Sequence, residues 1–275
     1  MKIANDELLE PLRRLAAEDA TNRAQLPVAI DQFLAQDDNQ KIPMALAIGL
    51  VGSLVGIRRS AQRRLSEALQ SLAPGSPAIV AALEQALDSN DPDLRWGAAY
   101  TLGKLSPENS RIWPAIQEML GAEDGDSRWA AAEITCAMAR QSPLLQEELR
   151  LATRAAGGTL RRMALYCLRD LRVEGLFYLA QERLADSETH GRLSALTTLT
   201  TTAVPPDHRA SLAGELVAML TSDPMPGVRR AAAATIGKLH LLEARPALET
   251  ASRSEDSALA RAARQALDRW PATQI

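Results

Sequence analysis

Residues Leu94-Arg95-Trp96-Gly97-Ala98-Ala99-Tyr100-Thr101-Leu102 recur along the chain as recognisable copies. The clearest copies are Ser127-Arg128-Trp129-Ala130-Ala131-Ala132-Glu133-Ile134-Thr135, Leu160-Arg161-Arg162-Met163-Ala164-Leu165-Tyr166-Cys167-Leu168 and Val228-Arg229-Arg230-Ala231-Ala232-Ala233-Ala234-Thr235-Ile236. Weaker copies contain Arg192 and Ala260, and a degenerate one begins at Ile57. Their anchor positions (58, 95, 128, 161, 192, 229 and 260) are 31 to 37 residues apart, which is the length of one helical hairpin.

A second apolar stretch precedes each anchored stretch, and polar turn residues separate the two. These preceding stretches are 77–87, 112–120, 144–152, 173–184, 210–220 and 242–250. The turns contain helix-capping and helix-breaking residues, as in Asp88-Ser89-Asn90-Asp91-Pro92 and Glu123-Asp124-Gly125-Asp126. A single hairpin cannot bury its apolar face, so stacked hairpins must supply the core. The sequence predicts an all-α, right-handed α-solenoid of about seven hairpins over 57–275, continuous with a helical capping region over 1–56.

Composition narrows the possible partners. Hydrophobic residues make up 46% of the chain and aromatic residues only 3%, which favours closely packed helices rich in Ala and Leu. The formal charge of −3 gives no global attraction to nucleic acid or anionic lipid. The apolar stretch 42–57 is shorter than the ~20 residues that span a bilayer, so we expect a buried helix and no membrane role. Two cysteines and an N-terminus without an apolar leader predict a cytoplasmic protein.

The motif Asp91-Pro92-Asp93-Leu94-Arg95, continued to Leu102-Gly103-Lys104-Leu105, has an echo that ends Ile236-Gly237-Lys238-Leu239. It resembles the short HEAT-like repeat first described in phycobilin lyase subunits, and the resemblance covers roughly residues 57–270. That family includes lyase subunits, a metal hydroxylase, DNA repair enzymes and many scaffolds. The resemblance therefore implies a fold and leaves the function open. Residues 1–56 depart from the pattern.

The anchor arginines admit two interpretations. They could form a phosphate-binding row, or they could bond to turn residues inside the repeat stack. The HEAT-like resemblance favours the second, a structural ladder that involves acids such as Asp93, Asp126 and Asp223. The arginines assigned to this ladder are Arg95, Arg128, Arg161, Arg192 and Arg229.

Helical geometry predicts an exposed stripe on the second helix of each hairpin. At 100° per residue, positions 96, 100 and 103 lie opposite the apolar side formed by 94, 97, 98, 101, 102 and 105. In HEAT-like solenoids the second helices line the concave groove, so the equivalent residues should form one partner-binding stripe. The stripe comprises Arg59, Arg63, Trp96, Tyr100, Trp129, Glu133, Arg162, Tyr166, Arg169, Leu193, Thr197, Arg230, Arg261 and Gln265. Trp, Tyr and Arg are enriched at binding hot spots, which favours a binding role, but Trp96 and Trp129 could instead pack over helix ends.

Catalytic interpretations find little support in the residue inventory. His190, His208 and His240 form no metal-binding pattern. Cys136 is expected on the groove side without a matching histidine, and Cys167 in the core. Gly157-Gly158 has no phosphate-loop context and is typical of a turn.

We therefore predict a non-catalytic, bacterial-type HEAT-like scaffold, adaptor or inhibitory module, with no cofactor or metal, that binds another protein in its groove. Trp96 and Trp129 would be its apolar anchors, and Arg162, Tyr166 and Arg169 its polar contacts. The alternatives are nucleic-acid binding through the same stripe, which salt dependence would reveal, and a phycobilin-lyase-like subunit.

Overall fold

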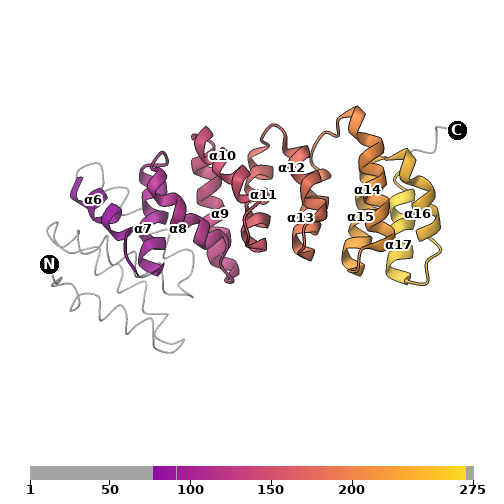
Figure 1. Cartoon of the computed structure of the whole chain (residues 1–275), viewed down its shortest axis with the longest axis horizontal. Coiled ribbons are helices and arrows are strands. Elements are labelled where there is room, and N and C mark those ends of the chain that lie inside the picture. Colours follow the sequence, from indigo (N-terminus) through magenta and orange to yellow (C-terminus); the bar gives the residue numbers. More distant parts are fainter. Residues whose placement is uncertain (1–76, 91, 271–275) are drawn as a thin grey trace, which may run out of the picture. The chain divides into compact units, whose positions relative to one another are not determined.

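A computed structural model describes residues 77–90 and 92–270 of the chain. It divides into two compact units, Met1–Leu145 and Gln146–Ile275, which we describe separately. The fold is all-α and belongs to the α-solenoid class of helical repeats, and the described residues contain no strand (Figure 1). The predicted capping region 1–56, with its boundary, and the predicted contacts Arg59 and Arg63 lie outside the described residues.

Each hairpin consists of a first helix, a polar turn and a second helix. In the described part of Met1–Leu145 the helices are α6 (Pro77–Ala86), α7 (Pro92–Leu105), η3 (Ser110–Ile112), α8 (Trp113–Leu120) and α9 (Gly125–Ala139). The next helix, α10 (Pro143–Ala152), contains the boundary between the units. Here α6, α8 and α10 are first helices, and α7 and α9 are second helices.

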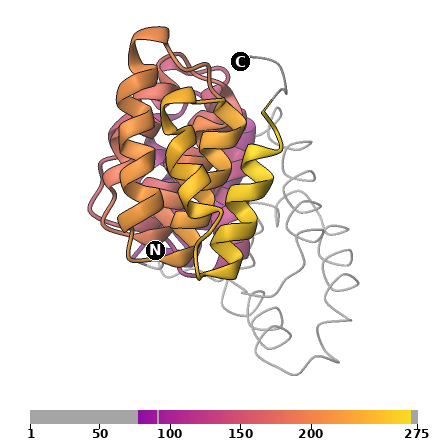
Figure 2. The same cartoon turned by 90° about the vertical axis from the view of Figure 1, so that its right-hand side faces the viewer.

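The unit Gln146–Ile275 continues the alternation. Its helices are α11 (Gly158–Leu171), α12 (Leu176–Glu182), η4 (Arg183–Ala185), α13 (Thr189–Leu199), η5 (Pro206–His208), α14 (Arg209–Ser222), α15 (Pro226–Leu239), η6 (Leu242–Ala244), α16 (Arg245–Ala251) and α17 (Ser257–Leu267). The second helices α11, α13, α15 and α17 contact one another in this order, and each first helix packs against the second helix that follows it. Figure 2 shows the last hairpin, with α16 and α17 side by side. No helix in the described residues is long and apolar enough to cross a membrane.

The capping and helix-breaking residues noted in the sequence lie at the ends of the helices. Asp124 caps α9 by accepting the Ser127 N–H at 2.7 Å, and Asp256 caps α17 through the N–H groups of Ala258 and Leu259. Proline occupies the first position of several helices, where no amide hydrogen is required. Helices α11 and α15 end in left-handed residues, Arg172 (φ 53°) and His240 (φ 49°).

Leucine and alanine fill the core, as the composition predicts. The core of Gln146–Ile275 includes Leu196, Leu212, Leu216, Ile236 and Leu248, all almost completely buried. Buried threonines of the second helices, three of them six residues after the anchor and Thr135 seven, donate to the carbonyl four residues earlier, which satisfies the hydroxyl without a polar partner from another helix. These threonines are Thr101, Thr135, Thr198 and Thr235.

The anchor arginines are held inside the fold by two kinds of contact. Each donates to a backbone carbonyl in the turn just before its own helix: Arg95 to Ser89, Arg128 to Ala122, Arg161 to Ala155, Arg192 to Asp186 and Arg229 to Asp223. Several also pair with a carboxylate further along the chain. Arg95 pairs with Glu118 on α8, a partner that the sequence did not suggest. The side chain of Asp93 lies outside the described residues.

In Gln146–Ile275 these contacts form a continuous ladder. Arg161 makes two hydrogen bonds to the Asp186 carboxylate, at 2.8 and 2.7 Å, and the Asp186 carbonyl accepts from Arg192. Arg192 binds the Asp223 carboxylate at 2.7 and 3.0 Å in the same bidentate manner, and the Asp223 carbonyl accepts from Arg229. Arg229 in turn lies 3.9 Å from Asp256. Asp186 and Asp223 therefore each join the arginine of their own hairpin to the arginine of the preceding one.

The ladder predicts that the free energy of unfolding falls in acid. Hydrogen bonds from Arg161 lower the pKa of Asp186. Burial raises the pKa of Asp223, but hydrogen bonds from Arg192 and from the Met225 N–H outweigh burial, so the pKa of this carboxyl is lowered too. The native state then binds fewer protons than the unfolded chain, whose Asp pKa is about 3.9. This stabilisation is complete above about pH 4 and is lost as the pH falls through the lower native pKa values.

Urea titrations at neutral pH and at about pH 3 should show this fall in the free energy of unfolding. Asp186→Asn, which cannot ionise, should be less stable at neutral pH and should lose less stability on acidification. An equal loss in both proteins would show that Asp186 is not one of the titrating groups.

Candidate interaction face

A narrow row of positions on the second helices is left uncovered by neighbouring helices. The row contains the residues one, five and nine positions after each anchor. We call these positions the open row. In Gln146–Ile275 they are Arg162, Tyr166 and Asp170 on α11, Leu193, Thr197 and Thr201 on and after α13, Arg230, Ala234 and Lys238 on α15, and Arg261, Gln265 and Arg269 on and after α17; all are exposed or half-buried.

The structure corrects the third position of the predicted stripe, which is the residue eight positions after each anchor. Simple helical geometry places Gly103 and Cys136 on the outward side, but both are buried, as is the equivalent Gly237. They are buried because each second helix also packs on the second helix of the next hairpin. A Cβ on Gly237 would lie 2.6 Å from the Ala266 Cβ of α17, and one on Gly103 would lie 3.0 Å from the Met138 sulfur of α9. The uncovered position is the following residue, such as Lys104 or Lys238.

In Met1–Leu145 the predicted aromatic anchors behave differently from one another. Trp96 and Tyr100 are 3% and 8% exposed, so the prediction that they lie on an open surface is wrong. Their rings pack edge to face, with centroids 5.5 Å apart, and the Lys104 ammonium lies 4.6 Å from the Tyr100 ring centre. Trp129, in contrast, is 44% exposed on α9.

A small cavity of about 300 Å³ lies between α7 and α9 on this side of Met1–Leu145. Tyr100, Lys104, Glu133 and Ala137 contribute to its lining. These residues are equivalent to the later open-row positions of Gln146–Ile275. The equivalent positions of Met1–Leu145 therefore line a cavity, although Trp96 and Tyr100 are themselves buried there.

Five of the six charged residues on the open row of Gln146–Ile275 are basic. Arg162, Arg230, Lys238 and Arg261 lie on it, and within the described residues none of them makes an ion pair or a side-chain hydrogen bond. Arg230 is within electrostatic reach of Asp256, without an ion pair. The same unit contains 17 Arg and Lys against 15 Asp and Glu, although the whole chain is acidic. A local basic face is thus present that the overall charge of −3 conceals.

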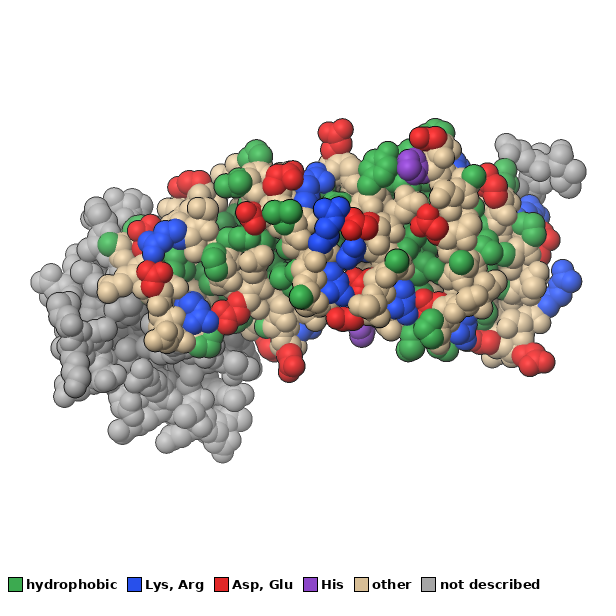
Figure 3. Space-filling view, in the orientation of Figure 1, with side chains coloured by type: hydrophobic (Ala, Val, Ile, Leu, Met, Phe, Trp, Pro, Cys, Tyr) green, Lys and Arg blue, Asp and Glu red, His purple; other side chains and the backbone are tan. Residues whose placement is uncertain are grey.

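Adjacent arginines in the sequence have different environments. Arg161 is almost fully buried and bound to Asp186, whereas its neighbour Arg162 lies on the open row. Arg229 bonds to the Asp223 carbonyl, and its neighbour Arg230 is likewise on the open row. The face seen in Figure 3 carries acidic and basic side chains interspersed over the described residues. The open row departs from this mixed pattern.

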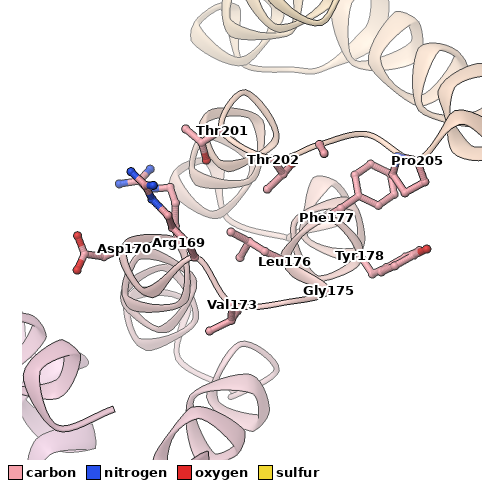
Figure 4. A pocket seen from close by; sticks show the side chains of 12 residues that line it. Arg169, Asp170, Val173, Gly175, Leu176, Phe177, Tyr178, Thr201, Thr202 and Pro205 are labelled. Carbon is pink, nitrogen blue, oxygen red and sulfur yellow. The ribbon is translucent and has the colours of Figure 1, made fainter. Parts of the chain in front are cut away.

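Arg169 lies next to Asp170, the last open-row position of α11. Its guanidinium lies 5.0 Å from the centre of the Tyr166 ring, in a cation–π contact. Beyond it, a cavity of about 680 Å³ lies between the end of α11, the turn into α12 and the end of α13. Figure 4 shows Arg169 and Thr201 on one side of this cavity and Phe177 and Pro205 on the other.

The remaining predicted residues have simple structural environments. Cys136 is buried, contrary to its expected groove position, and Cys167 is buried as expected. The described residues contain no cluster of three or more His, Cys, Asp or Glu suited to a metal ion. His208 packs against the rings of Phe177 and Tyr178, and His240 bonds to the Arg269 carbonyl.

Sequence reasoning missed Lys104, Ala137, Asp170 and Lys238 on this face, together with both cavities. The sequence contains a signal for Lys104 and Lys238, because both follow the glycine of the repeated Gly-Lys-Leu motif. The cavity beside Arg169 has no such signal, because its lining comes from turns whose lengths differ between repeats.

Comparison with known proteins supports a HEAT-like helical-repeat fold. No protein-family model matches the sequence, and no curated protein matches it. Among solved structures, Kap95p in a structure that describes its binding to RanGDP has a TM-score of 0.54 and 13% identity, covering 95% of this chain and 38% of that one. Kap121p has a TM-score of 0.52 and 12% identity, covering 97% and 34%. The chain spans little more than a third of either protein, and identities this low show the fold alone.

Proposed function

We propose that this chain is a non-catalytic protein-binding scaffold, adaptor or inhibitory module, and that the open row of Gln146–Ile275 binds an acidic segment of a partner protein. The observation that carries the proposal is the contrast between neighbouring arginines. The ladder arginines form hydrogen bonds inside the fold, whereas the cations of the open row have no such bonds within the described residues. Cations without internal partners are available to an external carboxylate.

The spacing of these cations suits an extended segment. Packed helices lie about 8–10 Å apart, so a chain crossing successive second helices meets a new open-row position about every three residues at ~3.3 Å per residue. Arg162, Arg230 and Arg261 are the residues nearest the anchor on α11, α15 and α17, and Leu193 interrupts them on α13. Arginine also presents a planar fork that matches a carboxylate in two bonds.

The fold class is compatible with this proposal, since one protein of similar fold, Kap95p, binds RanGDP. The exposed Trp129 offers a separate apolar contact in Met1–Leu145. Cys136 and Cys167 are both buried thiols, which fits a reducing, cytoplasmic setting. A lyase-like role of the phycobilin lyase type receives no specific support, because both thiols are buried and no chromophore-directed residue can be named.

Nucleic-acid binding is the second candidate, because the same cations flank an aromatic ring, Tyr166, that could stack on a base. The open row also carries Asp170, and the whole chain is acidic, which favours protein. The two candidates differ in their salt dependence. Phosphate contacts predict a steep loss of affinity with salt, whereas carboxylates on a folded-protein partner or peptide carry no condensed counterions and predict a shallower one.

The test is fluorescence anisotropy with two labelled probes, an acidic peptide of about nine residues with Glu at every third position and a single-stranded DNA of similar contour length. The triple variant Arg162→Gln, Arg230→Gln, Arg261→Gln should weaken peptide binding at least tenfold, about 1.4 kcal/mol, because three cations are lost from the row.

A matched control removes three positive charges from other surfaces of the same unit: Arg154→Gln, Arg245→Gln and Arg253→Gln. These side chains are exposed, and the ion pairs of Arg154 and Arg245 are solvent-accessible. The control should keep wild-type affinity. Equal losses in both triple variants would reduce the effect to net charge, and preferential, steeply salt-dependent DNA binding would replace the protein-binding proposal by the nucleic-acid one.

A further inference from the structure

The cavity beside Arg169 combines an apolar floor with a cationic mouth. Its floor is formed by Val173, Leu176 and Phe177, all less than a tenth exposed. Arg169 and Arg172 stand at its edge. Figure 4 shows the Phe177 ring beside Pro205 and Arg169 at the opposite margin. This pairing of an apolar recess with guanidinium groups is typical of a site that takes an apolar group bearing, or adjoining, negative charge.

The cavity opens at the end of the open row. Asp170 and Thr201 are open-row positions of α11 and α13, and both line the cavity. Arg169 also lines it while its guanidinium covers the Tyr166 ring of the open row. Asp170 lies eight residues, about 12 Å, along α11 from Arg162, so a partner segment bound at Arg162 reaches the mouth of this cavity if it continues along α11.

The local backbone keeps the cavity open. The chain leaves α11 through Arg172 in a left-handed conformation and enters α12 through Gly175 at φ 74°. The Val173 N–H bonds to the Leu168 carbonyl, which closes the end of α11, and Arg150 donates to the Glu174 carbonyl at 2.7 Å. These bonds fix the turn between the two helices. A fixed turn holds the recess in place without a ligand, which limits the ordering required on binding.

We propose that this cavity receives an aromatic side chain of the acidic partner segment, an inference that rests on the proposed function. Its volume of about 680 Å³ accommodates the largest side chain, and Val173, Leu176 and Phe177 provide its apolar lining. The guanidinium groups of Arg169 and Arg172 can stack on a ring and donate to flanking carboxylates. An aliphatic side chain would gain only the apolar floor. The segment so recognised is an aromatic residue flanked by acids.

Two acidic peptides of about nine residues test this proposal by anisotropy. They share the spacing of Glu and differ only in a central Trp or Ala. Wild-type protein should bind the Trp peptide about tenfold more tightly or better, because the indole leaves water. Ala203 is an exposed residue in the cavity wall, so Ala203→Trp fills the cavity and should remove the advantage of Trp while leaving the affinity for the Ala peptide unchanged.

The matched control is Ala218→Trp, on an exposed position of the first helix α14. It adds the same side chain away from the cavity and should preserve the preference for the Trp peptide. If both peptides bind wild-type protein equally, or if Ala203→Trp keeps the preference, the cavity proposal is wrong while the acidic-segment proposal stands. If neither peptide binds, both proposals are wrong.

Discussion

Replacing Asp186 by alanine is expected to lower the free energy of unfolding by about 3–5 kcal/mol, because it leaves a buried guanidinium without its partner. The side chain of Asp186 is 1% exposed and that of Arg161 is 9% exposed, so water cannot replace the lost bonds. Asp186 also accepts the Glu188 N–H at 2.9 Å, which would lose its acceptor in the variant. The loss should therefore exceed that of an ordinary surface ion pair.

The measurement is urea unfolding followed by circular dichroism, with Glu249→Ala as the control. Glu249 pairs with Arg245 at 3.1 Å, but both side chains are about half exposed. Such a helical surface pair contributes about 0.3–0.5 kcal/mol. If Asp186→Ala costs no more than Glu249→Ala, the ladder is not a source of stability.

Alanine substitutions at Gly237, on the second helix α15, and at Gly214, on the first helix α14, should change the free energy of unfolding in opposite directions. A Cβ on Gly237 would lie 2.7 Å from the Ala266 Cα and 2.9 Å from its carbonyl oxygen, so α15 and α17 would have to move apart. We expect Gly237→Ala to destabilise the protein by about 1–3 kcal/mol. At Gly214, on α14, a Cβ would meet no atom within 4 Å, and Gly214→Ala should stabilise by about 0.5–1 kcal/mol through helix propensity.

Thermal and urea unfolding of the two variants provide the comparison, since the chemical change is identical. Gly237→Ala should lower the transition midpoint and Gly214→Ala should raise it. A rise in both would mean that α15 and α17 can separate at no cost and that the glycine of the Gly-Lys-Leu motif has no packing role.

Much of the fold follows from the sequence. The repeated anchor, the capping acids and the prolines mark the beginnings of helices, and the observed helices begin and end close to the predicted stretches. The apolar stretches 173–184 and 242–250 are single elements in the sequence, but each is divided between an α-helix and a 3₁₀ turn in the structure.

The site was less predictable because helical periodicity describes one helix at a time. A helical wheel divided into one buried and one open side assigns Gly103 and Cys136 to the open side. In the structure, however, a second helix contacts its own first helix and the second helices on both sides. Only a narrow row remains uncovered, and its third position is displaced by one residue from that of the predicted stripe. The burial of Trp96 and the pairing of Arg95 with Glu118 depend on packing between elements, which no local pattern records.

The adjacent arginines have a consequence for how binding specificity can change. Because Arg161 and Arg229 hold the framework while Arg162 and Arg230 face outward, substitutions at the outward member leave the internal bonds intact. Several repeats thus offer a position that mutation can change without breaking these bonds, and the occupants already differ: Trp129, Arg162, Arg230 and Arg261. Trp96 is buried and Leu193 packs against the core, so these two positions are excluded. A library randomised at the remaining codons alone should yield well-folded proteins with new targets, which makes the repeat a candidate framework for engineered recognition.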